Sequence, residues 1–392
     1  MNFIKRYLSI IIPAAILLVA VVFIALTFIV NGGVASEMEK SISTGRRVSS
    51  LASQVPSEQQ PAIEKQYQDK HEEDAQRIKQ LFTETTTRQL ISYDIFPEPV
   101  DTSRQLFTNY GNDYRAKIEE LVASMNAVDA PSDSEISALL AGTGQRARAE
   151  ENNLIVEAYC KDRALKAKVY ASPNILSWFD FWYKYKFVSQ NIAVIDCWNS
   201  QVAYWIYEDV VETVNQLNES SRSIVDAPLK RIVGVSFTQS ADGQVQRGAK
   251  TSTIDQPIYI TEETPSIFVA ETWTNRRCDE NVDVIHFSLS VIVAVDEMPQ
   301  FMEALCSSKT HTFMGWDGQA QPKECERNQI TILKFDTVPV ERDSDQHKYY
   351  RYGKNAVVQW TGVCEYVFSR EAYESVMPES IKEKISGQED DR

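Results

Sequence analysis

Positive charge is scarce in this sequence of 392 residues: 40 lysines and arginines stand against 55 aspartates and glutamates, for a formal net charge of −15. Nucleic-acid binding requires basic patches that neutralise phosphates, so this deficit argues against a nucleic-acid partner. It argues equally against a protein that lies flat on an anionic lipid surface. We therefore expect a solvated acidic surface.

Catalytic motifs are also lacking. The chain contains no HExxH, no GxSxG and no arrangement of serine, histidine and aspartate whose spacing points to catalysis. Gly243 and Gly248, followed by Lys250, approach the spacing of a phosphate-binding loop, but Ala249 breaks its register. We therefore expect no bound nucleotide or other cofactor and no catalytic residues, and we interpret the protein as a non-enzyme.

None of the six cysteines forms a CxxC pair, and their spacings match no compact zinc site. The side chains considered for a metal are Cys278, Cys306, His311 and Cys325. We expect no metal there, because a lone histidine at the start of a strand is usually structural. Buried free thiols and one or two disulfides are equal alternatives, and the first pair to test is Cys160 with Cys197.

A long apolar run, by contrast, is present from Leu8 to Val30 and holds no charged residue. Its length predicts a transmembrane helix over residues 8–30, since a cleaved signal peptide has a shorter apolar region. Because Lys5 and Arg6 precede the run, the positive-inside rule places residues 1–7 in the cytoplasm. The rest of the chain would then lie in the periplasm, anchored to the inner membrane of a bacterium. The predicted anchor residues are Leu8, Ile12, Leu17, Val22, Phe28 and Val30.

Residues 31–95 are expected to form a helical or coiled-coil linker. An apolar stripe with charged flanks recurs there at helical spacing, and its coiled-coil face consists of Ile63, Tyr67, Ile78 and Phe82. A lone amphipathic helix packed on its own domain explains the same pattern. Under the coiled-coil interpretation, a homodimer or another envelope protein is the expected partner.

The pattern of residues 96–225 predicts an all-helical domain. It contains the most aromatic stretch of the chain, residues 178–187, whose sequence is WFDFWYKYKF. Such side chains more often form a core than a carbohydrate platform, because aromatic residues dominate burial. A platform would make the protein an extracytoplasmic module that binds a glycan or peptide, and it requires Trp178 and Trp182 to line an open cleft.

Residues 226–386 change character and predict an α+β domain. Strands are expected at Arg231–Phe237, Asp283–Val295, Ile330–Val340 and Ala356–Phe368, with a helix from Met298 to Cys306. Helices on one face of a mostly antiparallel sheet resemble the ferredoxin-like arrangement. Residues 387–392 are expected to be a disordered acidic tail. The expected fold class is therefore α+β: one transmembrane helix, a helical or coiled-coil linker, an all-helical middle region and a ferredoxin-like sheet.

In the order of these parts the chain resembles the PilO-type proteins, which are inner-membrane components of type IV pilus and type II secretion assembly platforms. The resemblance covers roughly residues 1–95 and 228–385, and the helical segment 103–220 is an insertion. It implies a non-catalytic, membrane-anchored scaffold of the cell envelope that acts through protein contacts. No residue signature carries the resemblance, and no catalytic residue follows from it.

Overall fold

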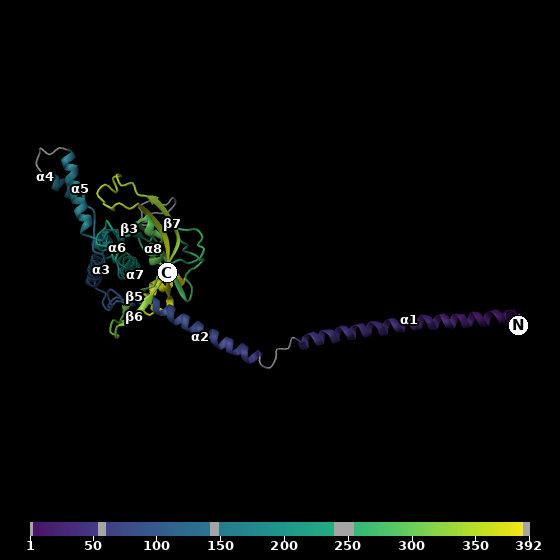
Figure 1. Ribbon diagram of the computed structural model, residues 1–392. Coiled ribbons are helices and arrows are strands. Elements are labelled where there is room, and N and C mark those ends of the chain that lie inside the picture. The colour runs from purple at the N-terminus through teal and green to yellow at the C-terminus, as the bar shows by residue number, and fades with distance from the viewer. Residues whose placement is uncertain (1–2, 54–59, 142–148, 239–254, 387–392) are drawn as a thin grey trace. The chain divides into compact units, whose positions relative to one another are not determined.

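The computed structural model describes residues 3–53, 60–141, 149–238 and 255–386. For residues 3–16, 25–26, 28–31, 51–53, 60–61 and 149 it describes the backbone alone. The chain divides into two compact units, Met1–Arg77 and Ile78–Arg392, which we describe separately (Figure 1). The predicted tail 387–392 and the glycine-containing segment around Gly243 lie outside the described residues.

The first unit is helical. It contains α1 (Phe3–Ser53) and the beginning of α2 (Gln60–Thr86). Of the helices described, none is long and apolar enough to cross a membrane, so the transmembrane helix predicted over residues 8–30 is corrected. The anchor positions whose side chains are not described are Leu8, Ile12, Phe28 and Val30.

A six-stranded mixed sheet forms the centre of the second unit, with the strand order β1-β2-β3-β4-β8-β7. Its strands are β1 (Ala127–Val128), β2 (Val169–Tyr170), β3 (Leu229–Ser236), β4 (Val282–Ala294), β8 (Val357–Ser369) and β7 (Ile330–Pro339). The first three pair in parallel and the last four pair antiparallel. A separate two-stranded sheet consists of β5 (Lys309–Phe313) and β6 (Lys323–Arg327).

The predicted ferredoxin-like sheet is therefore wrong, and the fold is mixed α/β. Two short parallel strands, β1 and β2, join the sheet from the region expected to be all-helical. A strand of two residues carries no periodic pattern, so the sequence holds no signal for it. The long elements are confirmed: the apolar run Asp283–Val295 is β4, whose residues are nearly all buried, and the helix expected at Met298–Cys306 is α8 (Met298–Leu305).

Helix α7 (Gln190–Leu217) joins the helical part of the second unit to the sheet. The other helices are α3 (Arg104–Ser124), α4 (Asp133–Ala141), α5 (Ala149–Leu165), α6 (Ser177–Tyr183), α9 (Arg370–Tyr373) and α10 (Glu379–Ser386). Both α3 and α8 pack against α7. At the end of α7, the Asn218 side chain donates to the carbonyl of Leu229 at 2.8 Å and accepts from its amide at 3.0 Å. These bonds tie the helix to the start of β3.

One continuous hydrophobic core contains residues of α3, α7 and the sheet, among them the fully buried Trp198, Trp205 and Trp360. Residues 96–225 and 226–386 therefore share a core inside a single compact unit. The change of composition near residue 226 marks a change of secondary structure and not the boundary between two separately packed domains.

Candidate functional site

The apolar stripe predicted on α2 is solvent-exposed. Ile63, Tyr67 and Ile78 are 49%, 62% and 67% exposed, and Phe82 is half-buried. Leu81 is 54% exposed and extends the same face, because 18 residues make five turns from Ile63. We call Ile63, Tyr67, Ile78 and Leu81 the α2 stripe.

The aromatic stretch 178–187 contributes to the core. Trp178 and Trp182 are 1% and 5% exposed, and Trp182 packs edge-on against Tyr110 of α3 with ring centroids 5.3 Å apart. An open cleft lined by both tryptophans is therefore absent from the described structure, and the carbohydrate platform in the form expected from the sequence is corrected.

All six cysteines are free thiols, so the disulfide considered between Cys160 and Cys197 is not formed. Cys197 lies in the main core with α7, whereas Cys160 on α5 is buried outside that core. The metal candidates do not form a complete site. His311 pairs with Cys325 across β5 and β6, but no group of three potential ligands is found among the described residues.

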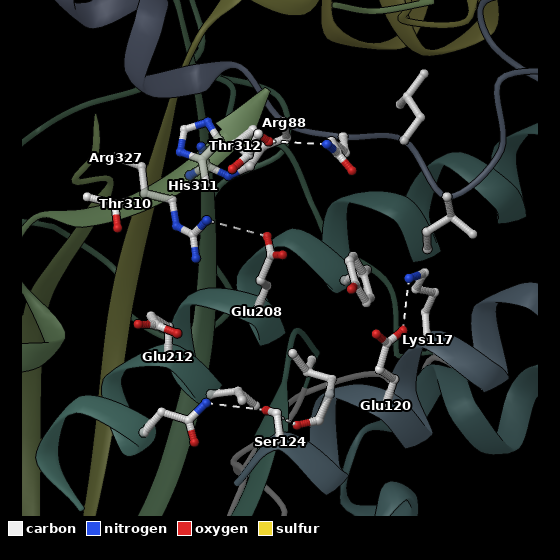
Figure 2. Close-up of a pocket in the computed structure, with 17 residues that line it drawn as sticks. Arg88, Lys117, Glu120, Ser124, Glu208, Glu212, Thr310, His311, Thr312 and Arg327 are labelled. Atoms are coloured by element: carbon white, nitrogen blue, oxygen red, sulfur yellow. Dashed lines mark hydrogen bonds and ion pairs between the residues drawn. The ribbon is translucent and has the colours of Figure 1, made fainter. Parts of the chain in front are cut away.

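A pocket of about 430 Å³ opens in the second unit (Figure 2). Its walls come from the loop after α2, from α3 and α7, and from β5 and β6. We call it the α3–α7 pocket. Figure 2 shows Arg88, His311 and Arg327 together at one end, while Glu212 and Glu120 lie away from them. Arg88 and Arg327 thus mark a basic end, and Glu212 and the Glu120–Lys117 pair lie away from it.

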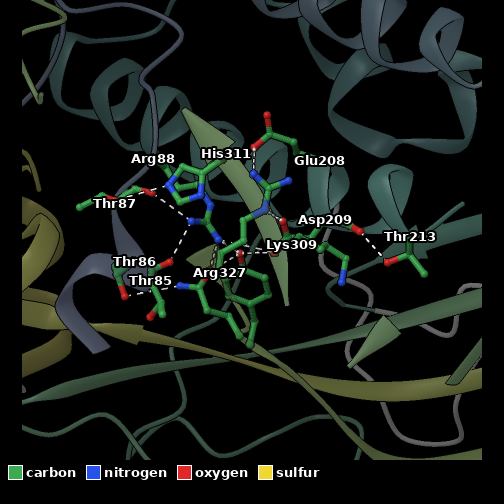
Figure 3. Close-up of polar contacts among 12 residues, drawn as sticks. Thr85, Thr86, Thr87, Arg88, Glu208, Asp209, Thr213, Lys309, His311 and Arg327 are labelled. Atoms are coloured by element: carbon green, nitrogen blue, oxygen red, sulfur yellow. Dashed lines mark hydrogen bonds and ion pairs between the residues drawn. The ribbon is translucent and has the colours of Figure 1, made fainter. Parts of the chain in front are cut away.

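A buried ionic network lies behind the basic end of this pocket and is centred on Asp209 (Figure 3). The Asp209 carboxylate is 2.5 Å from Nε of Arg327 and 3.6 Å from Nη2 of Arg88. It also accepts a hydrogen bond of 2.7 Å from the Tyr366 hydroxyl. Arg88 donates further to Gln329 and to Tyr366. All five side chains are buried, so each depends on the others for its polar partners.

Arg88 also joins this network to the end of α2. Its Nη1 donates to the carbonyls of Thr85 at 2.9 Å and Thr87 at 3.0 Å. A cation at the C-terminus of a helix satisfies free carbonyls and complements the helix dipole. One side chain therefore both ends α2 and lines the α3–α7 pocket.

Two further basic side chains, Lys309 and His311, lie beside the network. Lys309 is 3% exposed, and its ammonium donates to three backbone carbonyls at the end of α8 at 3.1–3.2 Å. Its pKa is lowered by burial. Burial, together with the charges of Arg88 and Arg327, lowers the pKa of His311 to about 4. His311 is therefore neutral near pH 7, in a region of positive potential.

The acidic end of the pocket is formed mainly by α7. Glu208 and Glu212 are four residues apart, so their side chains lie on the same face of the helix. Glu208 lies 3.7 Å from Arg327, and burial raises its pKa. On α3, Glu120 is paired with Lys117 at 2.9 Å. The arrangement offers charge and hydrogen bonds to a ligand.

Outside the pocket, the fold brings together Ser266, His286 and Glu365, which sequence spacing did not suggest. Nδ1 of His286 is 2.7 Å from the Ser266 hydroxyl, and Nε2 is 3.7 Å from Glu365. Arg276 and Thr274 also bind the Glu365 carboxylate, at 2.7 and 2.9 Å. These contacts attach the segment around residues 266–276 to the sheet, where Glu365 is fully buried. We interpret the group as structural.

Sequence reasoning missed the network because its members come from segments far apart in the chain. One signal was available. Asp209 follows Trp205 and Ile206 at helical spacing, so it falls on the buried face of α7. A carboxylate on such a face needs a buried partner, and Arg88 and Arg327 supply it. Their positions after α2 and in β6 could not be derived from spacing.

No protein-family model matches this chain, and no curated protein matches it. A crystal structure from Akkermansia muciniphila aligns with 68% of this chain and 96% of that chain, at 10% sequence identity and a TM-score of 0.24. A likeness at this level supports no conclusion about fold or function. The resemblance to PilO-type proteins stays a prediction.

Proposed function

We propose that this protein is a non-catalytic scaffold that acts through protein contacts, and that its partner along α2 is a second copy of the same chain. One observation carries the proposal: the four apolar side chains of the α2 stripe are each about half or more exposed. The four residues fall within roughly 60° of one another around the helix axis at 100° per residue. A narrow stripe of this kind is typical of a helix that pairs with another helix.

The charges beside the stripe favour a second copy as the occupant. Lys70 and Glu73 lie on one flank of the stripe and Glu64 lies on the other, and all three are exposed. The chain as a whole is strongly acidic, but this surface carries both signs. A strongly basic or strongly acidic partner would meet like charges there, whereas a second copy can match each sign with its opposite.

Co-purification of two differently tagged full-length chains tests this pairing. We expect the two tags to purify together, and Tyr67→Glu in both copies to separate them, because a charge would be buried in the seam. The matched control is Gln76→Glu, which adds the same charge on the opposite face of α2 and should leave the pair intact. Separation by both variants, or by neither, would contradict the proposal.

Two parts of the proposal rest on the sequence alone. They are the location of this scaffold in the cell envelope and its PilO-like role there. Genes for a pilus or secretion ATPase next to the gene for this chain would support that setting. Pairing through α2 does not depend on it.

A further inference from the structure

The basic end of the α3–α7 pocket brings together Arg88, Arg327 and His311, and two buried nitrogens of this group have no hydrogen-bond partner among the described residues. Arg88 and Arg327 share Asp209, and Arg327 reaches Glu208 as well, while Lys309 binds only backbone carbonyls. Arg88 is 1% exposed, yet its Nε has no hydrogen-bond partner among the described residues. Nδ1 of His311 is likewise buried without a partner there. An anionic group of a ligand would complement this end.

The acidic end holds a carboxylate that has no cation partner among the described residues. Glu212 accepts a hydrogen bond of 3.3 Å from Gln216, and no described cation lies within ion-pair distance of it. Glu208 stands one turn earlier on the same face of α7 and lines the same pocket. Two carboxylates at this spacing repel each other. A cationic group between them would relieve that repulsion.

We propose that the α3–α7 pocket binds a small zwitterion, a free amino acid or short peptide, with its carboxylate toward Arg88, His311 and Arg327 and its ammonium toward Glu208 and Glu212. A simple anion would face the two glutamates, and a simple cation would face the two arginines. Only a molecule that carries both charges complements both ends. The volume of about 430 Å³ is in the range of small-molecule sites.

Isothermal titration of the full-length chain with glycine, diglycine and triglycine tests this assignment, with acetate and methylammonium as single-charge probes at matched ionic strength. We expect one member of the glycine series to bind at least about tenfold more tightly than either single-charge probe. Glu212→Gln should weaken that binding by about tenfold or more. The control Glu303→Gln, on the exposed face of α8, should leave the affinity unchanged.

Two results would overturn the assignment. The first is acetate binding as tight as that of the best zwitterion, with no effect of Glu212→Gln, which would make the pocket an anion site. The second is the absence of any member of the glycine series that binds with a Kd below about 10 mM. Thermal unfolding of both glutamine variants checks that they are folded. Because Tyr67→Glu disrupts only the proposed pairing, its titration should match the wild type, so the two proposals fail separately.

Discussion

Replacing Asp209 by asparagine removes the one carboxylate that the two buried arginines share. Asp209, Arg88 and Arg327 are 2%, 1% and 4% exposed. Asparagine keeps the size of the side chain, and its oxygen can still accept the hydroxyl of Tyr366, which donates at 2.7 Å in the wild type. The substitution therefore changes charge with little change in packing.

The expected cost is about 3–5 kcal/mol in the free energy of unfolding, because removal of one member of a buried ion pair leaves the other charge uncompensated. Arg88 loses its ion-pair partner here, whereas Arg327 keeps Glu208 at 3.7 Å, so we expect the lower part of that range. Tyr366→Phe deletes only a hydroxyl bound to Asp209, Arg88 and Gln329, and should cost about 1–3 kcal/mol through unsatisfied buried partners.

Urea unfolding followed by tryptophan fluorescence measures both variants. All seven tryptophans lie in the second unit, so the signal reports the unit that contains the network. With a slope near 3 kcal/mol per molar, Asp209→Asn should lower the midpoint by about 1 M or more, and Glu303→Gln should leave it nearly unchanged. A loss below about 1 kcal/mol for Asp209→Asn would refute the network as a source of stability.

Three further substitutions test packing and protonation. Gly111→Ala should destabilise the second unit by about 1–3 kcal/mol, since a Cβ there would stand 2.5 Å from Cε3 of Trp182; an unchanged urea midpoint would contradict this packing. Burial raises the pKa of Asp196 to about 6, so the unfolded chain binds fewer protons between about pH 4 and 6 and stability falls as pH rises. Asp196→Asn should therefore stabilise the protein at pH 7 and not at pH 4, by urea unfolding at both values. The pKa of His311 is lowered to about 4, so its folded form resists protonation and stability falls as pH drops from about 6.5 to 4. His311→Gln should make that fall shallower, and an identical pH profile would count against the burial of the imidazole.

Long apolar patterns were sufficient to predict the long elements. The unbroken apolar run of β4 and the helical spacing of α7 both follow from residues next to one another in the chain. The pairing of β1 and β2 could not be predicted, because these two-residue strands form only through hydrogen bonds to segments that are distant in the sequence. For the same reason the helical region and the sheet looked like separate domains.

The candidate sites show the same limit. Exposure of Tyr67 and Ile78 agrees with the predicted interaction face on α2, whereas the inclusion of Leu81 depended on the phase of the helix over five turns. The α3–α7 pocket depends on Arg88 and Arg327, which are 239 positions apart in the chain. Their meeting at Asp209 is a result of tertiary packing, and a single sequence carries no signal for it.

Molar mass by light scattering, over a range of micromolar concentrations, tests pairing through α2 most directly. The account predicts that the full-length chain approaches twice its 44.6 kDa mass and that Ile78→Glu returns it to the mass of one chain, while Gln76→Glu does not. A mass of 44.6 kDa at every concentration, or a dimer that survives Ile78→Glu, would contradict it.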